Sequence, residues 1–190
     1  MKKAVLFLIV IFLTSPGCTT VKKKVRSVET LKYGTIVVMP FTEGQDADRT
    51  VLYNAFDNAL RRFEEIKVVD QEKLSQQFVE ELGLNHPLTT GAVDFTSSSE
   101  GNARRKKVHD LYGADAVIFG SLFEDAGVFS LAIQMLDVED GSLTLSFSQD
   151  VPFKPEASQE ALENLAKACV EKVMAHIRDN RVTTSVYKYE

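Results

Sequence analysis

The pattern of apolar and polar residues predicts several strands in the second half of the chain and one near its start. Residues 35–41 and 114–122 are almost continuously apolar and rich in β-branched residues. Such runs are typical of strands that are covered on both faces. Residues 129–147 alternate instead, with Asp140-Gly141 between the two halves, which predicts a β-hairpin with one face on the core.

Other stretches show the period of amphipathic helices. Apolar residues recur three and four positions apart in four segments, which are residues 49–63, 70–82, 102–112 and 155–177. Gly83 and Gly113 are placed to end two of these helices. A short strand is predicted at residues 66–70, whereas residues 84–101 have no period and predict a loop.

The predicted order is therefore β-α-β-α-α-β-β-β-α. Strands that alternate with helices indicate an α/β domain with a mixed sheet and flanking helices, joined by right-handed crossovers. We expect one such domain at residues 35–180, with a tether at residues 18–34 and a tail at residues 181–190 that adds an edge strand.

The N-terminus has the pattern of an export signal in residues 1–17. Lys2 and Lys3 precede ten apolar residues, Ala4 to Leu13, and a small, helix-breaking exit. Ten helical residues span only about 15 Å, which is half of the hydrocarbon thickness of a bilayer. The segment is thus too short for a membrane span and predicts a signal peptide.

Cys18 directly follows this segment, after Gly17. The stretch resembles the signal of bacterial lipoproteins, although Ser15 stands where leucine is usual. The resemblance implies acyl chains on Cys18, which would anchor the protein to a membrane almost permanently. Thr19 is not the aspartate that tends to retain lipoproteins at the inner membrane, which implies the periplasmic face of the outer membrane. An ordinary secretory signal is the alternative.

Charge and cysteine content narrow the classes of function. Without residues 1–17 the chain keeps 173 of its 190 residues, and its formal charge changes from −5 to −7 with the loss of two lysines. An acidic chain of this kind is a poor nucleic-acid binder. The only other cysteine, Cys169, lies on the apolar stripe of a predicted helix, so we expect a buried thiol and no disulfide.

Four segments together resemble one superfamily of bacterial lipoproteins. They are IVVMPF, VVDQEKLSQQFVEELGL, YGADAVIFGSL and LAIQMLDVEDGSL, in this order within residues 33–175. The superfamily contains the curli-secretion component CsgG, the penicillin-binding-protein activator LpoB and the N-terminal domain of TolB. The resemblance implies an anticodon-binding-domain-like fold and a lipoprotein that works through an unidentified envelope protein. It implies no catalytic residues.

Two departures from the superfamily narrow this expectation. The stretches 120–129 and 148–155 are too short to hold the membrane-spanning hairpins of CsgG, since a spanning strand needs about 9–11 residues. The tether also lacks the long proline-rich stretch of LpoB. We therefore expect an adaptor in secretion, flagellar or wall-synthesis machinery, and as the alternative a subunit of a homo-oligomeric ring that forms no pore of its own.

The sequence contains no catalytic or metal-binding motif. His86, His109 and His176 are scattered, and no HExxH or CxxC occurs. Serines 97, 98 and 99 lack the G-x-S-x-G pattern, and Asp115 and Asp137 flank strands, where capping and turn roles are usual. We expect no enzyme, no cofactor and no metal; an envelope hydrolase is the weakest alternative.

A basic run stands out in this acidic chain. Arg104, Arg105, Lys106 and Lys107 follow one another in the helix predicted at residues 102–112. A solvated helix face is the simplest interpretation. The alternative is that this face and the adjoining loop, residues 84–107, bind an acidic partner or a cell-wall polymer.

Overall fold

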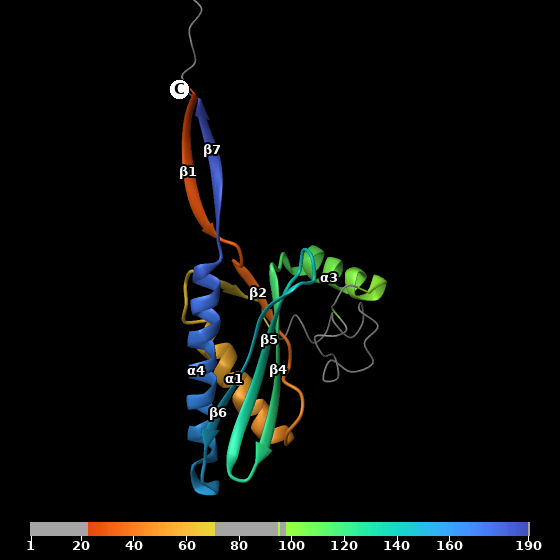
Figure 1. The fold of residues 1–190 in the computed structure, drawn as a ribbon, viewed down its shortest axis with the longest axis vertical. Helices are drawn as coiled ribbons and strands as arrows, with labels where there is room; N and C mark the ends of the chain where they lie inside the picture. The colour runs from red at the N-terminus through yellow and green to blue at the C-terminus, as the bar shows by residue number, and fades with distance from the viewer. Residues whose placement is uncertain (1–22, 71–94, 96–97, 190) are drawn as a thin grey trace, which may run out of the picture. The chain divides into compact units, whose positions relative to one another are not determined.

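The computed structural model describes residues 23–70, 95 and 98–189 (Figure 1). The chain divides into two compact units. One contains residues up to Val28 and from Thr183 onward, and the other contains Glu29–Val182. Cys18, His86 and the helix predicted at residues 70–82, except for Asp70, lie outside the described residues.

The two ends of the described chain pair with each other. Strand β1 (Lys23–Leu31) and strand β7 (Arg181–Tyr189) form a two-stranded sheet of their own. The tether predicted at residues 18–34 stays a prediction, and Lys23–Leu31 within it form a strand that the sequence analysis did not expect. The tail does form a strand, but it pairs with β1 and not with the edge of the main sheet. Valine and threonine residues favour a strand in β1, but the basic residues beside them give the segment the polar composition of a tether.

The main sheet has five strands in the order β3-β2-β4-β5-β6. Their bounds are β2 Thr35–Val38, β3 Lys67–Val68, β4 Ala116–Asp125, β5 Val128–Asp137 and β6 Leu143–Pro152. Strand β2 runs parallel to both β3 and β4, whereas β5 is antiparallel to β4 and to β6. The predicted mixed α/β fold is confirmed.

One face of the sheet is covered by helices α1 (Asp46–Leu60) and α4 (Ser158–Asp179), which contact each other. A short 3-10 turn, η3 (Pro155–Ala157), precedes α4. Alternate strand residues such as Ile36, Val38 and Ile118 point to this side and pack with Phe56 of α1. The apolar stripe of α4, which includes the fully buried Cys169, completes this core. The predicted buried position of Cys169 is confirmed.

Helix α3 (Ser99–Tyr112) covers part of the opposite face. Here Val37, Val117 and Leu136 pack with Val108 of α3 and with Phe95. The alternation of side chains along β2 and β4 explains why both helix layers find an apolar surface. The sheet is therefore buried on both faces at β2 and at the first half of β4, as the continuous apolar runs predict.

The connections agree with the sequence pattern in most places. Gly113 ends α3 in a left-handed conformation (φ 62°), and Gly141 has φ 75° in the turn between β5 and β6. A tight two-residue turn of Ala126 and Gly127 joins β4 to β5, with φ values of 47° and 78°. The stretch 120–129 is thus a hairpin of the main sheet.

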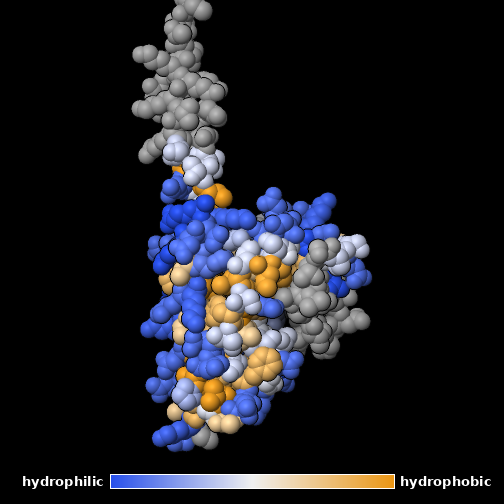
Figure 2. All heavy atoms as spheres, viewed as in Figure 1, coloured by the Kyte–Doolittle hydropathy of each residue, from blue (hydrophilic) through white to orange (hydrophobic). Residues whose placement is uncertain are grey.

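Hydrophilic residues cover most of the described surface, while orange and white residues gather over the strands in the middle of the view (Figure 2). Across residues 23–70, 95 and 98–189, no helix is both long and apolar enough to cross a membrane.

Candidate binding site

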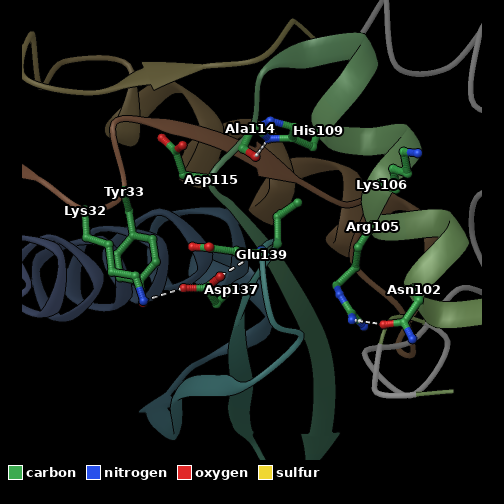
Figure 3. Close-up of a pocket in the computed structure, with 11 residues that line it drawn as sticks. Lys32, Tyr33, Asn102, Arg105, Lys106, His109, Ala114, Asp115, Asp137 and Glu139 are labelled. Atoms are coloured by element: carbon green, nitrogen blue, oxygen red, sulfur yellow. Dashed lines mark hydrogen bonds and ion pairs between the residues drawn. The ribbon is translucent and has the colours of Figure 1, made fainter.

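A cavity of about 530 Å³ lies beside α3, at the start of β4 and the end of β5 (Figure 3). Helix α3 contributes Asn102, Arg105, Lys106 and His109 to its lining. The rest comes from the start of the domain and from the strand ends, namely Lys32, Tyr33, Ala114, Asp115, Asp137, Val138 and Glu139. The site therefore combines residues that are far apart in the sequence.

Asp137 is the most buried charged group of the cavity, with only 1% of its surface exposed. Its Oδ2 lies 2.7 Å from the Nζ of Lys32, and its Oδ1 accepts a hydrogen bond of 2.8 Å from the backbone N–H of Glu139. The hydrogen bond and the charge of Asp137 raise the pKa of Lys32. A buried carboxylate needs such partners, because its desolvation is costly. Asp137 therefore holds the turn after β5, as its position in the sequence predicts.

Asp115 has a comparable structural role at the start of β4. Its Oδ2 accepts hydrogen bonds from the backbone N–H groups of Gly34 and Thr35, at 2.9 and 2.8 Å. These bonds fix the entry of β2 beside β4. The capping role expected for Asp115 is confirmed.

Arg105 departs from the predicted basic face. Only 4% of its surface is exposed, and its guanidinium donates to the carbonyl of Phe95 and to the side chain of Asn102. The guanidinium also packs against Gly141, where a side chain would have no room. Arg105 shares the inner side of α3 with Gly101 and Val108, three or four positions away. The prediction of an exposed Arg105 is therefore wrong, because the helical period turns this residue toward the sheet.

The other three basic residues lie nearer to solvent. Arg104 is half-buried, and Lys106 and Lys107 are exposed. Lys106 also lines the cavity. The predicted basic face thus remains as a smaller group of three residues, which we call the α3 basic face: Arg104, Lys106 and Lys107.

The histidines and serines do not form a catalytic group in the described part of the chain. The Nδ1 of His109 lies 3.3 Å from the carbonyl of Ala114, and His176 stacks on Tyr33 at 6.3 Å between ring centroids. Ser98 caps α3 by accepting a hydrogen bond from the N–H of Gly101. The described residues contain no group of three or more His, Cys, Asp or Glu side chains that could hold a metal ion.

Sequence reasoning missed Lys32 and Tyr33 as parts of the site. Both follow β1, in the segment predicted to be a tether, and their contacts are with residues more than a hundred positions away. Only the Tyr33-Gly34 pair before the first buried run offered a signal, because aromatic residues at the start of a domain commonly pack.

Solved structures with the same fold include a bacterial lipoprotein. Lipoprotein GNA1162 from Neisseria meningitidis aligns with a TM-score of 0.51 and 19% identity, over 75% of this chain and 96% of that one. The hypothetical protein CT253 from Chlamydia trachomatis aligns with a TM-score of 0.51 and 11% identity, over 77% and 99%. TolB from Acinetobacter baumannii aligns with a TM-score of 0.50 and 15% identity, over 83% of this chain and 32% of TolB.

These likenesses show a shared fold, so the predicted TolB-like fold is confirmed. No known protein family matches the sequence, and no curated protein matches it. The predicted likeness to CsgG stays a prediction.

Proposed function

We propose that the protein is a non-catalytic lipoprotein that is anchored through acyl chains on Cys18 and binds an envelope protein as an adaptor. We place it on the periplasmic face of the outer membrane. The sequence features that support the anchor are the apolar segment of residues 4–13 and the cysteine that follows Gly17. The fold shared with a Neisseria lipoprotein is compatible with this assignment.

The observation that carries the adaptor role is the way in which the charges of the cavity are arranged. Asp137, Asp115 and Arg105 are bound to other groups of the same domain. Lys106 is exposed and lines the same cavity, in a chain of net charge −5. The arrangement offers an exposed cation to a partner at the rim of a recess.

The chemistry of the α3 basic face selects an acidic partner. Lysine side chains at a rim steer a negatively charged surface and fix its register. The neighbouring cavity gives such a partner a recess of about 530 Å³ in which one side chain could be buried. We therefore assign the partner as an envelope protein with an acidic patch.

The anchor is tested by growth with labelled palmitate, with and without globomycin, an inhibitor of lipoprotein signal processing. We expect a labelled band for the wild type, and no label for Cys18→Ser. A wild-type chain that is exported without label would contradict the anchor.

The basic face is tested by comparing two double variants of equal charge. Lys106→Ser with Lys107→Ser changes the α3 basic face, whereas Lys67→Ser with Lys154→Ser removes two exposed lysines elsewhere. Arg105 stays in place, because its replacement would disturb the core. We expect the first variant to recover about tenfold less partner in a pull-down, and the second to recover as much as the wild type. Equal recovery by both variants would contradict this site.

A further inference from the structure

The edge of the main sheet at β6 carries an inference that does not depend on the proposed function. Strand β6 is the last strand in the sheet order, and within the described part of the chain β5 is its one neighbour. Helix α4 packs on one face of β6 but does not pair with it. Ten residues of backbone are therefore presented along an edge.

The register shows which backbone groups point outward. The N–H of Phe153 donates to the carbonyl of Gly127, and Val151 lies opposite Phe129. In an antiparallel pair the N–H and C=O of successive residues point alternately to the two sides. Residues 147, 149 and 151 therefore bond to β5, whereas Ser146, Ser148 and Asp150 direct their backbone groups away from it.

This edge lacks the features that usually block strand addition. Natural edge strands are short, twisted by bulges, or carry lysine and proline. Strand β6 contains no lysine or arginine; its irregularity lies at the Leu143 end, and its proline is the last residue, Pro152. Its single charge belongs to Asp150, whose carboxylate accepts a hydrogen bond of 2.6 Å from Ser130.

We propose that β6 pairs with β6 of a second copy of this chain, antiparallel and centred on Ser148. In this register each Ser148 faces its mate, and Ser146 faces Asp150. The three outward residues of each strand then satisfy one another's N–H and C=O groups. Both partners use the same patch, as a two-fold dimer requires.

The side chains of β6 fit this register. Leu145 of one copy lies opposite Val151 of the other, so that two half-buried apolar residues meet. No like charges face each other, because the two copies of Asp150 are four residues apart along the strands, or about 13 Å. The edge residues of one copy thus complement those of the second copy. The two five-stranded sheets join into one sheet of ten strands.

Disulfide trapping in membranes tests the register with the full-length chain. Ser148→Cys places one new thiol on the two-fold axis, where the Cα atoms of a bonded antiparallel pair are about 5.5 Å apart and a disulfide is feasible. Ser146→Cys places it about 13 Å from its mate, and Glu124→Cys places it on an exposed site of β4. The unmodified chain reports any background from Cys18 or Cys169.

After mild oxidation we expect Ser148→Cys to give about tenfold more disulfide-linked dimer than each of the other chains. Equal linkage at positions 146, 148 and 124 would overturn the register. A Ser148→Cys chain that stays unlinked while its thiol reacts with maleimide would overturn the dimer.

A proline variant tests the same edge without a new thiol. Because the N–H of Ser148 points away from β5, Ser148→Pro leaves the ladder to β5 intact, whereas it removes one donor from each copy. We expect the dissociation constant of the detergent-purified chain, from sedimentation, to rise about tenfold or more. Ser148→Ala keeps the N–H and should leave it unchanged. A wild-type chain that sediments as a monomer, or as a ring of three or more copies, would overturn the proposal.

Discussion

The Nζ of Lys32 lies 2.7 Å from the Oδ2 of Asp137 and joins the entry of the domain to the end of β5. Asp137 is almost completely buried, whereas 38% of the Lys32 side chain is exposed. The carboxylate of this ion pair therefore lies buried in the wall of the cavity, whereas the ammonium group lies near solvent. It also ties the chain that follows β1 to the rim of the proposed binding site.

Removal of this lysine should destabilise the domain. Loss of one partner from a fully buried pair costs about 3–5 kcal/mol, and we expect about 1–2 kcal/mol for Lys32→Met because solvent reaches its ammonium group. Urea unfolding would measure the change. The exposed Lys154→Met should change stability by less than about 0.5 kcal/mol. The double variant Lys32→Met with Asp137→Asn should recover part of the loss, and an equal loss for Lys154→Met would contradict the role of the pair.

Gly120 should tolerate no side chain. A Cβ at this position of β4 would overlap the ring of Phe41, which packs edge-on against Tyr53 and Phe56 with centroids 5.7 and 5.3 Å away. Overpacking of this kind costs about 1–3 kcal/mol, so Gly120→Ala should lower the free energy of unfolding by that amount.

Gly34→Ala is the matched control, because its Cβ would meet only Asp115 at an ordinary distance of 3.6 Å. The smaller side chain of Phe41→Leu should make Gly120→Ala less costly in the double variant. Additive effects of the two substitutions would show that the ring is not the obstacle.

His176 should make the stability depend on pH. Burial beside Tyr33 lowers the pKa of His176 below its usual value, because it disfavours the charged imidazole. Between pH 7 and pH 5 the unfolded chain then binds more protons than the folded one, so the free energy of unfolding falls as the pH falls. His176→Gln should flatten this dependence in urea unfolding at several pH values. The same slope in both proteins would show that His176 is not its source.

The sequence predicts the parts of this fold that depend on local pattern. The continuous runs at residues 35–41 and 114–122 become the central strands β2 and β4, and the long apolar stripe of α4 is buried as expected. The ends of helices are less accurate. Helix α1 begins at Asp46, three residues before the predicted start at residue 49, because acidic residues occupy its first turn.

Features that depend on distant contacts could not be predicted in this way. The residues of β1 contain no local pattern that indicates pairing with β7. The ion pair of Lys32 with Asp137 joins residues more than a hundred positions apart in the sequence. The β4–β5 turn is also hard to detect, because it has Ala126 at a position with φ 47°, where asparagine or glycine is usual.

The burial of Arg105 lies between these cases. Its spacing from Gly101 and Val108 places it on the inner side of α3, but a run of four basic residues suggests a solvated face. The structure resolves this conflict, since the buried guanidinium binds the carbonyl of Phe95 and the side chain of Asn102.

The most direct test of the adaptor is photo-crosslinking from the α3 basic face of the membrane-anchored chain. A benzophenone amino acid replaces Lys107 in one variant and the exposed Lys154 in another. We predict one discrete adduct with an envelope protein from position 107, none from position 154, and loss of the first adduct when Cys18→Ser releases the chain from the membrane. The same adducts from both positions, or an unchanged adduct in the released chain, would contradict an anchored adaptor that binds its partner through α3.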